Sequence, residues 1–357
     1  MTTKKRAQEK QTIGIDIGDK YSYICVLDHD GDIKEESRVS TSMAAFSKRF
    51  SGLAPARIAL ETGTHSPWIS RLLSTLGHEV LVGNARKLRM IYASHSKTDT
   101  LDARNLAKVA RFDPNLLSPI QHRAEQGQAH LAMIRSRDTL VTTRTSLVNH
   151  VRGMVKAFGA RINKCSASCF HKQAKAQLPA LLKPALLPVI EMIASVNQEI
   201  KAFNQELERL SAETYPETEL LRQVNGIGLI TALAFVLTIE DPARFVKSRS
   251  VGPFLGLTPR KRQSGERDPN LPISKAGDTK MRSLLVQCAQ YILGPFGQDC
   301  DLRRYGENIK ANGGAYAKQR AVVAVARKLS VLLHHLWRSG EVYDPFFKQT
   351  RPQRQAA

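Results

Sequence analysis

Four carboxylates, placed in order along a pattern of alternating strands and helices, constrain this chain more than any other feature. Asp16 lies inside an apolar strand-like segment, and Glu61 ends a second such segment. Asp99 and Asp102 open a predicted helix, where acids three residues apart lie on the same side. Carboxylates gathered at one place repel each other unless a divalent cation neutralises them, and oxygen ligands favour Mg²⁺ or Mn²⁺. The order therefore predicts a metal site.

Each of these acids also has an ordinary structural explanation. Asp16 could be a turn residue at a strand end, and Glu61 could be a partly exposed strand end. Asp99 could be the N-cap of its helix, and Asp102 could complement the helix dipole. The joint arrangement favours the metal site, because two ions about 4 Å apart can bind both the attacking and the leaving oxygen of a phosphodiester.

The first 115 residues have the pattern of a mixed α/β domain. Helices are predicted at residues 46–50 and 67–76, and strands at residues 13–17, 22–27, 32–38, 58–61 and 79–82. Residues 28–32 predict a hairpin turn between the second and third strands. An antiparallel meander followed by βα units resembles the order of an RNase H-like domain. Prolines at positions 114 and 119 then break the pattern and predict a linker.

The charge of the chain indicates a nucleic-acid partner. It carries 53 lysines and arginines against 32 acids in 357 residues, a net charge of +21. Such an excess is typical of proteins that bind polyphosphates, and a membrane surface is the other polyanion to consider. The longest apolar run that we identify, residues 229–239, is short of the roughly 20 residues of a membrane-spanning helix. We therefore expect a cytoplasmic, nucleoid-associated protein.

The cysteines indicate a reducing compartment. There are five, an odd and scattered set that does not suggest a disulfide framework. Cys165, Cys169 and His171 have part of the spacing of a metal site, but no second pair follows them. Thiols in a loop or core are therefore a better explanation than zinc.

The middle of the chain is predicted to be helical. From Leu186 to Leu210 apolar residues recur at spacings of three and four, which is typical of a coiled-coil seam. An earlier helix, residues 125–158, is strongly basic. Either the two helices form an intramolecular hairpin with a solvated charged face, or they form a dimerisation and nucleic-acid arm, which we favour. The candidate nucleic-acid contacts in this region are Arg135, Arg144 and Arg152.

The last third carries two further signals. Residues 224–229, Val-Asn-Gly-Ile-Gly-Leu, resemble a helix-hairpin-helix turn, whose backbone N–H groups can approach a phosphate; a plain interhelical turn is the alternative. Ser264 lies in a basic segment, where cations could stabilise charge on a phosphate under attack; an ordinary loop serine is the alternative. The candidate nucleic-acid contacts here are Gly226, Gly228, Arg260, Lys261, Arg262, Lys275 and Arg282.

With these motifs in this order, the chain resembles the bacterial insertion-sequence transposases that join a DEDD, RuvC-like domain to a serine-bearing C-terminal domain, the bridge-RNA-guided recombinases. The resemblance extends over nearly the whole chain. The motifs that carry it are Gly14-Ile15-Asp16, Glu61-Thr62-Gly63, Lys97-Thr98-Asp99-Thr100-Leu101-Asp102-Ala103-Arg104, Gly226-Ile227-Gly228, Gly256-Leu257-Thr258-Pro259, Gln263-Ser264-Gly265 and Ile273-Ser274-Lys275-Ala276-Gly277.

The resemblance implies an architecture and a set of partners. Residues 1–120 would form an RNase H-like (RuvC-like) α/β catalytic domain and residues 121–215 a helical coiled-coil arm. Residues 216–345 would form a mainly α transposase domain, and residues 346–357 a disordered tail. A structured non-coding RNA would pair with donor and target DNA, and homodimers would assemble into a tetramer with composite sites.

The resemblance also assigns the chemistry. Asp16, Glu61, Asp99 and Asp102 would be Mg²⁺ ligands, with Mn²⁺ also possible, and Ser264 would be the nucleophile that joins DNA to the protein. The segment after Glu61 departs slightly from the family pattern but leaves the acid in place.

Three other functions fit parts of the sequence. A structure-specific endonuclease of the Holliday-junction resolvase type would use the acids with water instead of Ser264. An actin-like ATPase or sugar kinase would explain Asp16-Ile17-Gly18-Asp19 as a phosphate-binding turn, but we find no second phosphate loop. A non-catalytic DNA-binding protein would not need the four acids.

Overall fold

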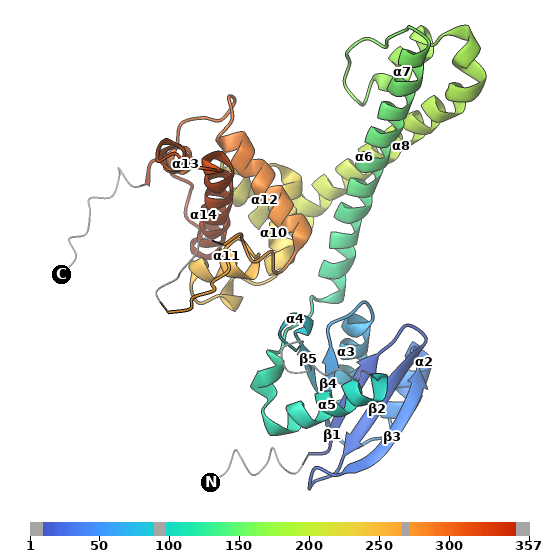
Figure 1. Cartoon of the computed structure of the whole chain (residues 1–357), viewed down its shortest axis with the longest axis vertical. Helices are drawn as coiled ribbons and strands as arrows, with labels where there is room; N and C mark the ends of the chain where they lie inside the picture. Colours follow the sequence, from blue (N-terminus) through green and yellow to red (C-terminus); the bar gives the residue numbers. More distant parts are fainter. Residues whose placement is uncertain (1–9, 89–97, 266–270, 348–357) are drawn as a thin grey trace, which may run out of the picture. The chain divides into compact units, whose positions relative to one another are not determined.

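The computed structural model describes residues 10–88, 98–265 and 271–347, and the chain divides into two compact units. The first, residues 1–123, contains a five-stranded sheet, and the second, residues 124–357, is helical (Figure 1). The arm and the C-terminal domain that we predicted separately lie within the second unit. The predicted tail lies outside the described residues from position 348 onward.

The sheet has the mixed topology expected from the sequence. Its order is β3-β2-β1-β4-β5, with β1, β2 and β3 antiparallel and β4 and β5 parallel to β1. Between β2 and β3 the Asp28 carboxylate accepts three backbone N–H groups at 2.8 to 2.9 Å, which closes the predicted turn. All five predicted strands are confirmed, and the strands are β1 (Thr12–Ile17), β2 (Tyr21–Leu27), β3 (Ile33–Ser40), β4 (Arg57–Glu61) and β5 (Glu79–Gly83).

Helices cover both faces of this sheet. On one face α2 (Met43–Phe50) and α3 (Ser66–Thr75) pack on the isoleucines of β1 in a common apolar cluster. On the other face α5 (Asp99–Phe112) crosses β1 at Gly14, where a Cβ would lie 2.0 Å from the carbonyl oxygen of Ala103. A glycine is therefore required at this crossing, because any side chain would push the helix away from the strand.

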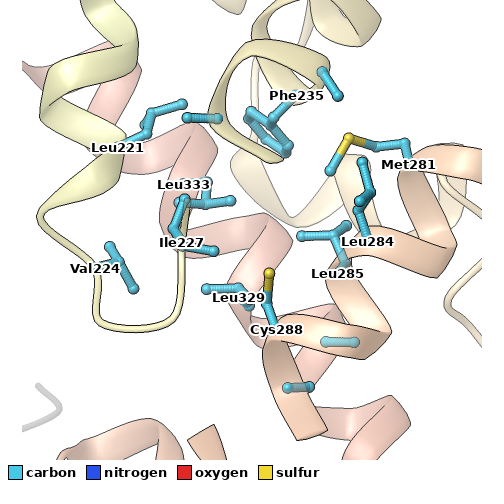
Figure 2. Packing of buried hydrophobic residues seen from close by; sticks show 14 of the residues in the cluster. Leu221, Val224, Ile227, Phe235, Met281, Leu284, Leu285, Cys288, Leu329 and Leu333 are labelled. Carbon is cyan, nitrogen blue, oxygen red and sulfur yellow. The ribbon is translucent and has the colours of Figure 1, made fainter. Parts of the chain in front are cut away.

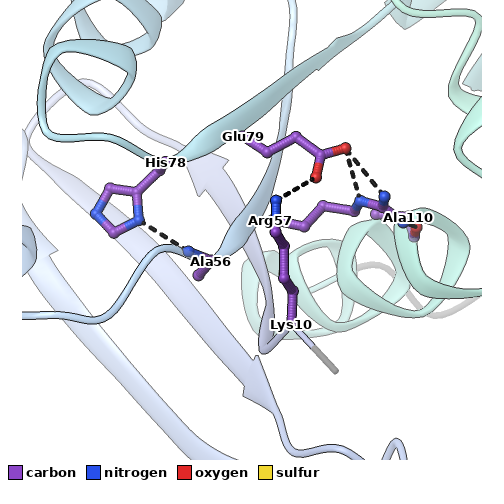
Figure 3. Close-up of polar contacts among 6 residues, drawn as sticks. All are labelled: Lys10, Ala56, Arg57, His78, Glu79 and Ala110. Atoms are coloured by element: carbon purple, nitrogen blue, oxygen red, sulfur yellow. Dashed lines mark hydrogen bonds and ion pairs between the residues drawn. The ribbon is translucent and has the colours of Figure 1, made fainter. Parts of the chain in front are cut away.

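Polar contacts fix the end of the sheet at which β4 and β5 begin (Figure 3). Arg57 donates from Nε to Glu79 Oε1 at 3.0 Å and from Nη1 to the Ala110 carbonyl at 3.4 Å, which ties α5 to the start of β4. Lys10 adds a 3.5 Å contact to the same carboxylate. Buried His78 accepts from the Ala56 N–H at 3.2 Å.

The predicted linker after α5 is part of the first unit. The short helices α4 (Ala85–Leu88) and η1 (Pro114–Leu117) flank β5, and the Ile120 N–H donates to the Val82 carbonyl at 2.8 Å. Leu117 is fully buried. The prolines therefore mark a turn of chain against the sheet edge, and the unit ends at residue 123.

The second unit begins with a long helical hairpin, which we call the arm. Helices α6 (Glu125–Ala157) and α8 (Lys183–Thr214) lie side by side, joined through α7 (Phe170–Gln177) and η2 (Ala180–Leu182) (Figure 1). In the predicted seam on α8, Val189 and Phe203 are half-buried. The other seam residues are buried, and they are Leu186, Ile193, Val196, Ile200, Leu207 and Leu210. The seam packs against α6 and α7 of the same chain, so the hairpin alternative is the one that the structure adopts.

Two arginines of α6 lie inside this hairpin. Arg137 donates to the Asn204 side chain at 3.0 Å, and Arg144, one heptad later, donates to Asn197 at 2.9 Å. Arg144 Nε is buried without a hydrogen-bond partner among the described residues. Burial, and then the charge of Arg137, lower the pKa of Arg144. Polar layers of this kind reduce stability but specify which residues of two helices pair.

The remaining helices pack around α10, whose residues from Thr231 to Ile239 are all buried. Figure 2 shows the cluster in which Leu221, Phe235, Met281 and Leu333 lie. The apolar run noticed in the sequence is thus the central helix of a core. The helices are α9 (Glu217–Arg222), α10 (Leu229–Ile239), α11 (Val251–Phe254), α12 (Thr279–Ile292), α13 (Asp301–Ala311) and α14 (Ala317–Ser339), with the short turns η3 (Pro242–Arg244) and η4 (Ser248–Ser250).

One helical stretch, Ala180–Thr214, is long and apolar enough by length and composition to cross a membrane. Lys183, Glu191, Glu199 and Lys201 interrupt it, so it is not a continuous apolar run. This stretch holds the arm seam, and its apolar side chains contact α6 and α7. Of its most apolar 18-residue window, 28% is buried inside the protein.

Candidate catalytic site and nucleic-acid interface

Asp16 and Glu61 lie at the carboxyl ends of neighbouring parallel strands. The pairing of β1 with β4 extends to the residues immediately before them. Gly14 and Ala59, two residues earlier on each strand, both lie against α5. Because side chains alternate across a strand, Asp16 and Glu61 lie on this same face of the sheet.

Helix α5 carries the other two acids to the same end. Its last turns lie at the start of β4, where Arg57 binds the Ala110 carbonyl, and Arg111 donates to the backbone of the hairpin turn at residues 28–29. The helix thus runs opposite to β1 and β4, and its first turn, with Asp99 and Asp102, lies toward the carboxyl ends of these strands. The fold therefore brings all four predicted acids to one end and one face of the sheet.

The N-cap of α5 is Thr98, whose hydroxyl accepts the Leu101 N–H at 3.3 Å. Asp99 is the first helical residue and is exposed, so the alternative that Asp99 caps the helix was wrong. Asp102 is half-buried and begins the helix face that lies beside Ala103 on the sheet. The helix dipole alternative remains compatible with both positions.

In this structure the four carboxylates are not close enough together to bind one metal ion. Among the described residues, no three His, Cys, Asp or Glu side chains are close enough together to hold a metal ion. Asp16, Glu61 and Asp102 are half-buried and each has an interaction partner. The donor type and the shared face fit Mg²⁺ or Mn²⁺, whereas ligation requires the four carboxylates to turn toward one another.

The segment that follows Glu61 is firmly held. The Thr62 hydroxyl donates to the Gly83 carbonyl at 2.8 Å and accepts the Ala85 N–H at 3.0 Å. The backbone N–H of Thr62 donates to the same carbonyl at 3.0 Å. These bonds join the ends of β4 and β5 and fix the backbone from which the Glu61 side chain extends.

A polar trio at this end of the sheet escaped the sequence analysis. Trp68 Nε1 donates to His65 Nδ1 at 3.1 Å, and His65 Nε2 lies 3.5 Å from Asp19 Oδ1. In neutral His65 the indole bond places the proton on Nε2, facing Asp19. The signal was available, because Asp19 and His65 each follow a predicted ligand by three or four residues. The contact links the loops after β1 and β4.

Ser264 lies on a loop of the second unit, and we call the described residues on either side of it, 258–265 and 271–274, the serine loop. Its two sides pair as a short antiparallel ladder: the Arg260 N–H donates to the Pro272 carbonyl at 3.0 Å, and the Ser274 N–H donates to Thr258 at 2.8 Å. Ser264 itself is exposed. A hydroxyl in this position is accessible to an outside phosphate.

The base of the serine loop is tightly built. Gly256 and Gly277 have φ of +69° and +71°, and a Cβ on either would lie within 2.2 Å of a backbone oxygen. Arg282 is 9% exposed and donates to the carbonyls of Leu255 at 3.0 Å and Ala276 at 2.7 Å. We predicted Arg282 as a nucleic-acid contact; in the structure its guanidinium instead joins the two sides of the loop base.

Comparison with known proteins identifies the family. A transposase family model, DEDD_Tnp_IS110, matches residues 13–159, which include all four acids. A second, for transposases of the IS116/IS110/IS902 family, matches residues 218–298, which include Ser264. This chain belongs to the IS110/IS116 family of insertion-sequence transposases. It is a DNA transposase, and the resemblance drawn from the sequence is confirmed at this level.

Curated relatives agree with this assignment. The transposase for insertion sequence element IS1111A of Coxiella burnetii is 25% identical, over 95% of this chain and 94% of the relative. The transposase for IS1328 of Yersinia enterocolitica is 28% identical, over 78% of this chain and 82% of the relative. A probable family 20 transposase of Pseudomonas aeruginosa is 29% identical, over 71% and 76%.

The helix-hairpin-helix-like turn of this transposase joins α9 to α10. Gly226 has φ of +92°, and Gly228 is the N-cap of α10. A shallow pocket of about 420 Å³ lies here, lined also by Gln287 and Tyr291. The turn joins two helices as predicted, and the N–H groups at the start of α10 have no acceptor within the helix itself.

The predicted cationic contacts of the transposase differ in accessibility. Arg260, Lys261 and Arg262 are exposed on the serine loop, and Lys275 is exposed at its base with φ of +53°. The contacts predicted on α6 are partly used inside the protein: Arg135 pairs with Asp278 at 3.2 Å, Arg144 lies within the arm, and Arg152 stacks 5.2 Å from the Phe170 ring centroid.

The candidate thiols of the transposase have ordinary surroundings. Cys165 packs against the apolar cluster at the arm tip, and Cys169 is exposed. His171 Nδ1 lies 3.3 Å from the Asn197 amide nitrogen. These contacts favour the explanation of loop and core thiols.

Proposed function

We propose that this transposase cuts and rejoins DNA strands through attack of Ser264 on a phosphodiester, with Asp16, Glu61, Asp99 and Asp102 holding Mg²⁺. What supports the proposal is that β1, β4 and α5 carry the four acids, distant in sequence, toward one end and one face of the mixed sheet. The exposed serine in a basic loop with a rigid base is the second element.

The chemistry balances without an external energy source. Ser264 Oγ loses its proton and forms a bond to phosphorus, while the bond from phosphorus to the 3′ oxygen breaks. The 3′ oxygen leaves as a hydroxyl, and the DNA 5′-phosphate stays on Ser264. A 3′-hydroxyl from another strand can then reverse the step. Bound divalent cations would lower the pKa of the attacking hydroxyl and stabilise charge on the phosphate.

The residues of the chain have separate tasks in this scheme. Glu61 extends from a backbone that Thr62 holds at the ends of β4 and β5, so its carboxylate has a fixed origin. Arg260, Lys261 and Arg262 would bind phosphates beside Ser264, because all three are exposed on the same loop. Gly226 and Gly228 would let the backbone of the turn before α10 approach a further phosphate.

We also propose the partners that the family resemblance implies. A structured non-coding RNA would pair with donor and target DNA, and the net charge of +21 suits two polyanionic partners. Acids and serine lie in different units, which suits composite sites in a homodimer or tetramer. Since the arm seam is used within the chain, dimer contacts would have to use other surfaces.

The experiment that tests the chemistry is trapping of a covalent adduct. The transposase, with any RNA that co-purifies, is incubated with Mg²⁺ and a suicide DNA substrate, and the adduct is mapped by peptide mass spectrometry. We expect a phosphoserine at position 264, none with Ser264→Ala, and an undiminished yield with Ser250→Ala, another exposed serine of the same unit. Ser264→Cys should keep slight activity, because a thiolate is also a nucleophile.

The second candidate function is a resolvase-type endonuclease with water as the nucleophile. It would use the same acids and leave the serine loop as a DNA contact. Normal cleavage by Ser264→Ala, without an adduct in the wild type, would establish this function instead.

A further inference from the structure

The tip of the arm has an unusual charge. From residue 139 to residue 190 the sequence has eight lysines and arginines and no aspartate or glutamate. We call this segment the basic tip. The rest of α8 is different, because glutamates recur along it from Glu191 to Glu213. One half of the arm is therefore mixed in charge and the other half is purely cationic.

The basic tip has its own apolar core. Val151, Ile162, Phe170 and Ile190 belong to a buried cluster that is distinct from the cluster around α10. Helix α6 contributes Ile134 to the cluster around α10 and Val151 to the cluster of the tip. These two residues are 17 positions apart, which is about 25 Å along a helix that rises 1.5 Å per residue. Surface charges of the tip can therefore be changed without touching the core that holds the serine loop.

The cations of the tip are available to a partner. Lys156, Arg161, Lys172 and Lys175 are exposed, and no carboxylate lies in the same segment to pair with them. Lys172 and Lys175 line an open pocket of about 410 Å³ against α8, with Glu191 at its border. Exposed cations held on a folded surface are the ordinary means of binding a phosphate backbone.

The tip also exposes an aromatic ring among these cations. Phe158 follows the last turn of α6, is 52% exposed, and lies between Lys156 and Arg161 in sequence. Gly159, with φ of +74°, turns the chain directly after it. Exposed aromatic rings beside basic groups stack on unpaired bases, which a duplex does not offer.

We propose that the basic tip binds an unpaired segment of RNA, with Phe158 stacking on a base and Lys156, Lys172 and Lys175 binding phosphates. This inference rests on the proposed RNA partner, because a folded RNA offers single-stranded loops. It adds a binding surface on the arm, packed on an apolar cluster distinct from the one beneath the serine loop. Arg152, already stacked on Phe170, would position the surface without binding the RNA itself.

The test measures binding of the full-length transposase to a short single-stranded oligo(A) RNA and to duplex DNA of equal length, over a range of salt concentrations. The variant Lys156→Gln/Lys172→Gln/Lys175→Gln should weaken RNA binding and lower the slope of log affinity against log salt by about 2, since each single-strand phosphate contact contributes about 0.7. Phe158→Ala should weaken RNA binding roughly five- to hundredfold and leave duplex binding unchanged.

The matched control is Lys34→Gln/Lys48→Gln/Lys201→Gln, which removes the same charge from three exposed lysines outside the tip. We expect it to bind RNA nearly as the wild type does. The proposal would be overturned if the tip variant and the control lost the same amount of RNA affinity. It would also be overturned if Phe158→Ala lowered the affinities for RNA and for duplex DNA equally. Absence of RNA binding in the wild type would instead contradict the RNA partner itself.

Discussion

The acids and the serine of this transposase are positioned in two different ways. The acids lie on regular elements, at strand ends and in the first turn of a helix, where hydrogen-bonded geometry fixes their direction. Ser264 lies on a loop whose base is held by Gly256, Gly277 and Arg282 and whose described sides pair as a short ladder. The first arrangement uses regular secondary structure, whereas the second uses a loop built on close backbone contacts.

This difference indicates which positions in each region should be sensitive to substitution. In the first unit the sensitive positions are the acids and the glycine crossing under α5. In the second unit buried Arg282, which lies outside the serine loop, holds the base of that loop, so a substitution there should affect catalysis indirectly. The acids therefore depend on regular backbone for their position, whereas Ser264 depends on contacts at the base of its loop.

The largest effect should come from the acids. Asp16→Asn, Glu61→Gln and Asp102→Asn should each reduce strand cleavage at least about a hundredfold, because each removes a charge that would hold the metal. Cleavage assays with Mg²⁺, and thermal unfolding of each variant, provide the measurement.

The control for the acids is Asp30→Asn, an exposed acid in the hairpin turn at the opposite end of the sheet. It should keep full activity. Full activity in two of the three acid variants would contradict the metal site. Residues 1–123 would then lack the function proposed for them.

The next effect concerns the base of the serine loop. Arg282→Lys keeps the positive charge but cannot reach both the Leu255 and Ala276 carbonyls, and leaving one such buried group unpaired costs about 1–3 kcal/mol. We expect a lower free energy of unfolding and a loss of adduct formation.

Arg260→Lys, on the exposed side of the same loop, provides the comparison for Arg282. It should leave the free energy of unfolding unchanged. If Arg282→Lys unfolds at the wild-type denaturant concentration but loses salt-dependent DNA affinity, Arg282 is a phosphate contact after all.

A smaller effect is expected from the exposed cations of the loop. Replacing Arg260, Lys261 and Arg262 by glutamine should lower the salt dependence of duplex DNA affinity by up to roughly three, at about 0.9 for each phosphate contact. Stability should not change, because all three side chains are exposed. Titrations at several salt concentrations measure the slope, and an unaltered slope would place the DNA elsewhere on the protein.

The smallest effect concerns pH and the helical unit. Burial, more than the nearby charges of Arg338 and His335, lowers the pKa of His334, whose Nε2 donates to the Pro242 carbonyl at 3.0 Å. The unfolded chain therefore binds the proton more readily below the ordinary histidine pKa of about 6.5.

Stability from His334 should thus be complete above that pH and decrease as the pH falls below it. Urea unfolding of the wild type and of His334→Gln at a series of pH values measures the difference. Parallel pH dependence in the two proteins would show that His334 contributes nothing to it.

Much of the first unit followed from local patterns. Short strand-like segments bounded by turn residues identified all five strands, and the turn at residues 28–32 identified the hairpin, because each depends on neighbours in sequence. The acids were found for the same reason. Asp19 and His65 were not, because their contact joins two loops that only the pairing of β1 with β4 brings together.

The sequence by itself determined the positions of the strands and the periodicity of the arm, which depend on short-range spacing, and its motifs indicated the family. Only the tertiary structure decided which side chains are used internally. The seam of α8 packs on its own chain, Arg144 lies between two helices, and Arg282 binds backbone carbonyls. A cation that binds a phosphate and one that binds a carbonyl look alike in a sequence, because burial depends on residues far away along the chain.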